Sequence, residues 1–126
     1  MSGMVCTRPD IGYTIGVVNR YMSNPGKDHW VVVKWILQYL RGTLRVCLLF
    51  GSGNPTLEGY IDSDMSVDAD TSRSTSGYIM TYVGGDVWWK SRLQKVVALS
   101  TTAAEYMAAA EAGKEIIRMK EFISKL

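Results

Sequence analysis

The spacing of apolar residues changes once along this chain, near Gly42, and that change limits the folds open to it. Before Gly42, apolar residues recur every three or four positions, as on one face of a helix. After Gly42, short apolar and β-branched runs alternate with turn sequences such as "GSGNPT", a pattern typical of strands. A chain with helices first and strands afterwards is expected to form an α+β structure.

Two helices are predicted before the change in spacing. The first covers about residues 9–22, and the Pro-Gly turn in "SNPGKD" ends it. The second covers about residues 29–41, with Asp28 as the expected N-cap and Gly42 just beyond the C-terminal end. Because only a short turn separates the two helices, we expect them to pack as an antiparallel pair.

Strands and one long helix are predicted after Gly42. The extended segments are expected at residues 44–50, 57–63, 77–83, 87–91 and 95–99. The polar stretch "DMSVDADTSRSTS" is expected to be a loop, and "GGD" a tight hairpin turn. Ser100 or Thr101 is expected to cap a helix that runs to Leu126. The second part of the chain is therefore an antiparallel strand meander followed by one long C-terminal helix.

Composition excludes several classes of protein. A chain of 126 residues with 47% hydrophobic residues suits a small folded domain, and its net charge of +2 permits nucleic-acid contact without requiring it. Cys6 and Cys47 lie in apolar runs, and with the single His29 they are too few for a zinc site. Both cysteines are expected to be buried free thiols. No signal peptide or membrane span is recognisable, so we expect an intracellular chain, cytoplasmic or nuclear, with no membrane partner.

Two carboxylates are candidates for a metal site. Asp62 ends a predicted strand in "GYIDSD", and Glu105 lies in the first turns of the last helix. If that helix packs across the sheet, the two side chains could share Mg²⁺, which prefers oxygen ligands. The same residues are also explained as exposed acids beside a turn and a helix start, where they favour the helix dipole. Asp64 shares the strand end with Asp62, whereas the loop acids Asp68 and Asp70 are interpreted as solvated turn residues.

Basic and aromatic residues gather around the same loops. Arg73, Lys90 and Arg92 are the candidate basic residues, and Trp88 and Trp89 directly precede Lys90. Such a group can form a groove that contacts phosphates and stacks bases. It can equally be a solvated face above a tryptophan-rich core. Composition leaves both interpretations open.

Four blocks of this sequence resemble the end of copia-type retrotransposon polyproteins, at the junction of reverse transcriptase and ribonuclease H. The blocks are "TRPDIGY" with "RYMSNPGKDHW", "VKWILQYLRGT", "GYIDSD" followed by "RSTSGY", and "WKSRLQKVVALSTTAAEYMA". They cover nearly the whole chain in the family's order and spacing. The resemblance implies a partial ribonuclease H fold and cleavage of the RNA strand of RNA–DNA hybrids with two Mg²⁺ ions. It divides the chain into a helix pair similar to the reverse-transcriptase connecting region, 1–43, and a truncated ribonuclease H-like domain, 44–126.

The resemblance also assigns the site. It implies that Asp62 and Glu105 are the first catalytic aspartate and the catalytic glutamate, and that both bind Mg²⁺ or Mn²⁺. Ala103 stands where the family usually has a second glutamate, and Leu126 precedes the family's next strand with its "CDNQ"-like motif. We therefore expect an incomplete site that binds metal weakly and is weak or inactive alone. The alternative is a domesticated nucleic-acid-binding or protein-interaction module without catalysis.

The resemblance has a further consequence for assembly. In the family's fold, the strand with the "CDNQ"-like motif lies beside the "GYID" strand. Without it, the "GYID" strand is an edge with free N–H and C=O groups. We expect that edge to support self-association, or to be covered by the N-terminal helix pair.

Overall fold

The computed structural model describes residues 2–65 and 70–126, and describes side chains from residue 4 onward. Asp68, one of the predicted loop acids, lies outside the described residues. The chain forms two units, Met1–Leu48 and Leu49–Leu126. Each unit is described by itself. The first is helical and the second combines a sheet with a helix, so the α+β class is confirmed. The ribonuclease H-like identity of the second unit stays a prediction.

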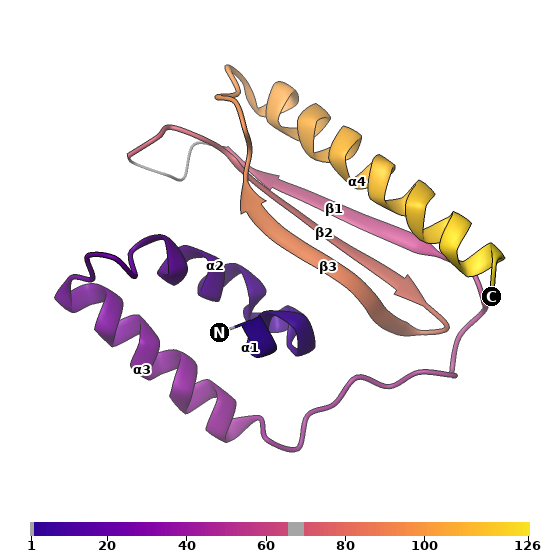
Figure 1. Ribbon diagram of the computed structural model, residues 1–126, viewed down its shortest axis with the longest axis horizontal. Helices are drawn as coiled ribbons and strands as arrows, with labels where there is room; N and C mark the ends of the chain where they lie inside the picture. The colour runs from indigo at the N-terminus through magenta and orange to yellow at the C-terminus, as the bar shows by residue number, and fades with distance from the viewer. Residues whose placement is uncertain (1, 66–69) are drawn as a thin grey trace. The chain divides into compact units, whose positions relative to one another are not determined.

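The first unit contains the predicted helix pair and one helix that the sequence did not indicate. Its elements, in chain order, are α1 (Ser2–Thr7), the 3₁₀ helix η1 (Pro9–Ile11), α2 (Gly12–Arg20) and α3 (Lys27–Gly42) (Figure 1). Ile15 is fully buried at the centre of a core that also contains Ile11, Val18 and Ile36. Helix α1 has six residues, too few to be stable alone, and Met4 and Val5 pack it against this core.

The start of α3 differs from the prediction. Its N-cap is Gly26 rather than Asp28, which lies in the first turn. The Nδ1 atom of His29 accepts the backbone N–H of Gly26 at 2.8 Å, and the His29 ring stacks on Tyr21 at 4.2 Å between centroids. A side chain at the third helical position therefore satisfies the N-cap N–H, as glutamate does in a capping box. At the other end, Gly42 lies inside the last turn rather than beyond it.

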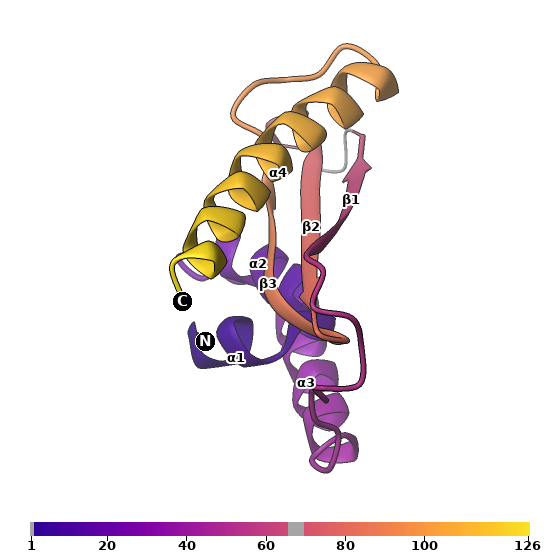
Figure 2. The same cartoon turned by 90° about the vertical axis from the view of Figure 1, so that its right-hand side faces the viewer.

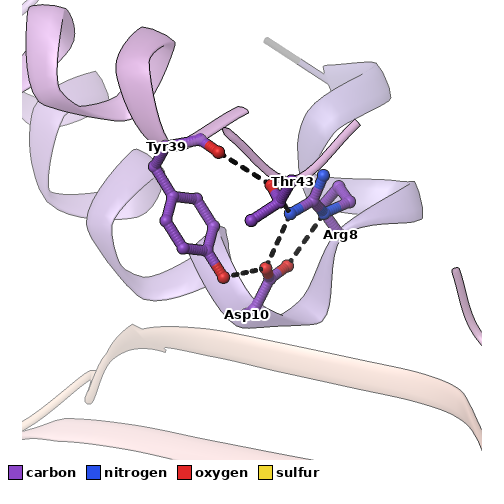
Figure 3. Close-up of polar contacts among 4 residues, drawn as sticks. All are labelled: Arg8, Asp10, Tyr39 and Thr43. Carbon is purple, nitrogen blue, oxygen red and sulfur yellow. Dashed lines mark hydrogen bonds and ion pairs between the residues drawn. The ribbon is translucent and has the colours of Figure 1, made fainter. Parts of the chain in front are cut away.

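A polar network connects the segment before α2 to the end of α3 (Figure 3). The Arg8 guanidinium donates to both carboxylate oxygens of Asp10, at 2.8 and 3.1 Å, and to Oγ1 of Thr43 at 2.7 Å. The Tyr39 hydroxyl donates to Asp10 at 2.6 Å, and the Thr43 hydroxyl donates to the Tyr39 carbonyl at 2.8 Å. The hydrogen bonds from Arg8 lower the pKa of Asp10 to about 2.

The second unit is a three-stranded antiparallel sheet with one helix on one face (Figure 2). Its strands lie in the order β1-β2-β3, and its elements are β1 (Glu58–Asp64), β2 (Thr75–Tyr82), β3 (Gly85–Leu93) and α4 (Thr101–Ser124). Helix α4 packs on β1 and β2 through a stripe of small residues, Ala104, Ala108 and Ala112, spaced four apart. The buried Tyr78 and Met80 of β2 lie beneath the helix.

Strand β1 is the outer strand on the side of the sheet opposite β3. Among the described residues, it pairs with β2 alone. The "GYID" strand is therefore an edge strand within this part of the chain. Self-association through that edge, or its cover by the helix pair, stays a prediction.

Two of the five predicted strands are wrong. Residues 44–50 form no strand, and Leu44, at 78% exposed, packs against little. The chain just beyond them contacts the β2–β3 hairpin instead, where the Gly51 N–H donates to the Val83 carbonyl at 2.9 Å. Residues 95–99 form bends that lead from β3 to α4. In both segments β-rich composition was misleading, because a strand also requires a neighbour that offers hydrogen bonds.

The two cysteines are free thiols, as predicted, but both are exposed rather than buried. Cys6 lies in α1 and Cys47 in the irregular segment after α3. The prediction of burial rested on their apolar neighbours, and the segment around Cys47 is itself largely exposed.

No helix in the described part of the chain is both long enough and apolar enough to cross a membrane.

The β2–β3 hairpin turns at Val83 and Gly84 rather than at "GGD", since β3 already begins at Gly85. Both turn residues have positive φ, +53° at Val83 and +81° at Gly84. Two positive φ values in a two-residue loop define a type I′ turn, which suits the twist of a hairpin. Glycine adopts this conformation freely, whereas a β-branched valine is strained there.

Replacing Val83 by asparagine should therefore stabilise the second unit. Asparagine tolerates positive φ better than valine. The free energy of unfolding should therefore rise by about 1 kcal/mol, at most the cost of the left-handed conformation for an ordinary residue. Thermal unfolding followed by calorimetry measures it. The control is Val97→Asn, at an exposed valine without positive φ. Equal effects of the two substitutions, or a loss of stability from Val83→Asn, would contradict the assignment of strain.

The Asp10 network should make the first unit sensitive to acid. The pKa of Asp10 is lower in the folded chain, about 2, than its ordinary value of about 4. Its ionised form therefore stabilises the fold above about pH 4, and this contribution disappears as the pH falls through about 2. Because the Asp10 side chain is 35% exposed, solvent screening limits the contribution to about 1 kcal/mol.

Urea unfolding followed through the NMR methyl signal of the buried Ile15 tests this expectation. Asp10→Asn should lower the midpoint at neutral pH and remove most of the difference between neutral and acidic pH. Tyr39→Phe, which keeps the ion pair with Arg8, should have a smaller effect. An Asp10→Asn chain with the same acid dependence as the unmodified chain would refute the role of this network.

Candidate functional site

The position of Glu105 depends on where α4 begins. The Ser100 hydroxyl accepts the backbone N–H of Ala103 at 3.1 Å, so Ser100, one of the two predicted caps, is the N-cap. Glu105 follows in the second turn and is exposed. It is adjacent to the fully buried Ala104, so it lies on the flank of the helix face that contacts the sheet.

The register of β1 decides which way its side chains point. Ile61 pairs with Tyr78, which is buried beneath α4 together with Ala112. Paired residues of antiparallel strands share a face, and neighbours alternate. Ile61 therefore lies on the α4 face. Asp62, which pairs with Gly77, leaves the strand toward the opposite face.

Both predicted acidic residues line one open pocket between β1 and α4, although the register of β1 directs the Asp62 side chain toward the opposite face. The pocket has a volume of about 230 Å³ and is lined by Ile61, Asp62, Ser63, Glu105, Ala108 and Ala109. Half of these residues come from β1 and half from α4, and none comes from β2. The structure thus brings together two acids that lie far apart in the sequence.

The pocket offers oxygen donors. Glu105 is an acid at the α4 side of the pocket, Asp62 is an acid of β1 whose side chain starts on the opposite face, and the Ser63 hydroxyl is buried with no hydrogen-bond partner among the described residues. Within residues 2–65 and 70–126, no group of three or more His, Cys, Asp or Glu residues lies close enough to hold a metal ion. Mg²⁺ is usually held by one or two carboxylates together with waters and substrate phosphate. Two acids are therefore enough for one such ion only if the Asp62 side chain turns toward Glu105 and a substrate completes the coordination.

Two of the candidate basic residues share a face with one tryptophan. Lys90 and Arg92 of β3 pair with Tyr78 and Ser76, which puts both on the α4 face of the sheet. Trp88 is on this face as well, and its indole N–H donates to the Tyr78 hydroxyl at 3.3 Å. Because α4 packs on β1 and β2, this side of β3 stays open, and Trp88 and Lys90 are exposed.

The other predicted members are separated from this group. Trp89 pairs with Ile79 and lies on the opposite face of the sheet. Arg73 is exposed in the loop that precedes β2. The predicted tryptophan pair is therefore divided between the two faces.

Arg92 has a partner that the sequence did not indicate. Its guanidinium forms an ion pair with Glu111 of α4, and both side chains are partly exposed, 41% and 25%. Arg92 thus links β3 to a helix that otherwise packs on the other two strands. No motif identifies Glu111, because its role depends on how α4 lies across the sheet.

The chain is similar to proteins encoded by plant transposons. A retrovirus-related Pol polyprotein from transposon TNT 1-94 of Nicotiana tabacum is 57% identical over 126 residues, all of this chain and 10% of that polyprotein. A second one, from transposon RE2 of Arabidopsis thaliana, is 38% identical over 111 residues, 87% of this chain and 8% of that polyprotein. These relatives place the chain in the class of retroelement sequences.

The chain covers most of the length of a shorter relative. The secreted RxLR effector protein 161 of Plasmopara viticola is 44% identical over 115 residues, 90% of this chain and 81% of that protein. The chain is thus homologous over most of its length to retrovirus-related Pol polyproteins from plant transposons. It spans about a tenth of the length of the tobacco polyprotein.

No protein-family model matches the chain. No solved structure matches it either.

The Arg92–Glu111 ion pair should contribute little to stability. Exposed and partly exposed pairs are worth about 0.2–1 kcal/mol, and salt screens them. A double-mutant cycle with Arg92→Met and Glu111→Gln, measured by urea unfolding, should give a coupling free energy in this range that shrinks in about 1 M salt. A coupling free energy above about 2 kcal/mol, or one that salt does not change, would show that the pair is a main support of α4.

Proposed function

We propose that this chain is a ribonuclease H-like part of a retroelement Pol polyprotein, and that its Asp62–Glu105 pocket acts in metal-dependent cleavage of the RNA strand of RNA–DNA hybrids. The observation that supports this most is the shared pocket. One acid comes from β1 and the other from α4, and both line the same opening. The resemblance of "GYIDSD" and "AEYMA" to the family's catalytic blocks selects the same two residues.

The two carboxylates would bind Mg²⁺ or Mn²⁺ weakly. Two negative groups at one pocket repel each other, and a cation relieves that repulsion. Asp62 starts on the face away from α4, and because β1 is the outer strand its carboxylate can turn around the edge toward Glu105. When bound, the ion supplies positive charge that stabilises the oxygens of phosphoryl transfer. Because phosphate completes the coordination, the affinity for metal should rise when the hybrid is present.

The open side of β3 would bind the nucleic-acid backbone. Lys90 is exposed beside Trp88 on this face, and Arg73 is exposed in the loop before β2. Lysine and arginine contact phosphates, while an aromatic ring offers a stacking surface. Arg92 would join them only by leaving Glu111, so we assign it a smaller part.

Binding of a labelled RNA–DNA hybrid tests this proposal. By fluorescence anisotropy, the unmodified chain should bind the hybrid about tenfold more tightly in Mg²⁺ than in EDTA, and either Asp62→Asn or Glu105→Gln should remove that difference. Lys90→Gln should weaken binding in both conditions to the same extent, because it removes a phosphate contact and no metal ligand. Cleavage by this chain alone in Mn²⁺ should be slow or undetectable, because two acids do not hold the second ion that stabilises charge in the transition state. Each ~1.4 kcal/mol of barrier that this loss adds costs a factor of ten in rate.

Three results would change the proposal. Hybrid binding that neither Mg²⁺ nor the two substitutions affect would refute the metal site. Metal-independent binding that Lys90→Gln weakens would instead indicate a nucleic-acid-binding module without catalysis. Rapid cleavage that both acid substitutions abolish would show that the expectation of weak activity is wrong.

A further inference from the structure

Gln94 forms a buried polar link between the sheet and the start of α4. It directly follows β3 and is 3% exposed. Its side-chain nitrogen, Nε2, donates to the Ser76 hydroxyl of β2 at 2.8 Å and to the backbone carbonyl of Ala104 at 2.9 Å. Its own backbone N–H donates to the carbonyl of Ser74 at 2.8 Å. One side chain therefore contacts both β2 and α4 beneath the first turns of the helix.

The orientation of the Gln94 amide follows from its partners. A backbone carbonyl only accepts hydrogen bonds, so the nitrogen of the amide must face Ala104. The amide oxygen is then left buried with no hydrogen-bond partner among the described residues. An unpaired buried oxygen lowers stability, and an apolar side chain of similar size would avoid that cost. Packing alone therefore does not explain a glutamine here.

The remaining contacts of this end of α4 are not directional. Ala104 and Ala108 present only methyl groups to the sheet, so they allow close approach but interlock weakly along the helix axis. The hydrogen bond from Gln94 has a required length and angle. It acts on the carbonyl of Ala104, the residue before Glu105, and so restricts where Glu105 lies along β1.

We propose that Gln94 is a positioning residue that fixes the first turns of α4 along the sheet and thereby holds Glu105 opposite Asp62. The expected effect on metal binding rests on the proposed function of the pocket, whereas the expected effect on the position of α4 does not. Gln94 lines no part of the pocket, so it acts only through the helix.

Gln94→Met is the test variant, because it keeps the size of the side chain and removes the donor. Ile116→Ala is the matched control. Ile116 packs against the core toward the other end of α4. It lies close to Gly59 of β1, since a Cβ built on Gly59 would be 3.0 Å from the Cδ1 atom of Ile116. Both variants should lower the melting temperature, and both are compared well below it, after NMR spectra confirm that they are folded.

Two measurements are made on each 126-residue chain. The first is the set of nuclear Overhauser contacts between the β1 and α4 residues that line the pocket; Gln94→Met should weaken or lose them and Ile116→Ala should keep them. The second is the Mn²⁺ dissociation constant from calorimetry. Gln94→Met should raise it about tenfold, the size of effect seen when a support of a metal ligand is removed, and Ile116→Ala should leave it within about twofold.

The two measurements separate the positioning role from the proposed function. Unchanged pocket contacts in Gln94→Met would refute the positioning role whatever happens to Mn²⁺. Equal effects of both variants on the contacts would also refute it, as would altered contacts with an unchanged dissociation constant in a chain whose Mn²⁺ binding Glu105→Gln weakens. If Glu105→Gln leaves Mn²⁺ binding of the unmodified chain unchanged, the metal site is wrong, and the pocket contacts alone then decide whether Gln94 positions α4.

Discussion

The close packing of α4 on β1 and β2 is the constraint on which the candidate site depends. Ala104, Ala108 and Ala112 form the contact surface of the helix, and their small side chains let its backbone approach the sheet. A larger residue at the first of these positions would move the helix outward and carry Glu105 away from β1. The pocket that contains both acids is therefore a consequence of the alanine stripe as much as of the acids themselves.

The same packing divides the surface of the second unit into two regions. Because α4 covers β1 and β2, the pocket lined by Asp62 and Glu105 lies between β1 and α4, and the basic, aromatic group of β3 stays open on the other side of the helix. The acids proposed to bind a cation and the basic residues proposed to bind phosphates are thus placed on either side of one helix. Arg92 and Glu111 connect these regions, since their ion pair joins β3 to α4.

The sequence predicted those elements whose signal is local. The Pro-Gly turn, the hairpin and the Ser100 cap depend on residues near in sequence, and the helix pair, the three paired strands and α4 were all located within a few positions. The segments 44–50 and 95–99 were wrong because composition does not show whether a neighbouring strand exists. The same limit applies to the site. Asp62 and Glu105 could be named, whereas Glu111 and Gln94 act through contacts that only the packing of α4 creates.

Paramagnetic broadening by Mn²⁺ tests the central claim most directly, because it locates the ion without requiring catalysis. At low occupancy, the amide signals of residues 61–63 in β1 and 105–109 in α4 should broaden together, before those of β3. Asp62→Asn and Glu105→Gln should each remove the broadening from both segments, since one ion needs both carboxylates. Broadening of only one segment, or broadening that survives either substitution, would show that the two acids share a pocket but not a metal ion.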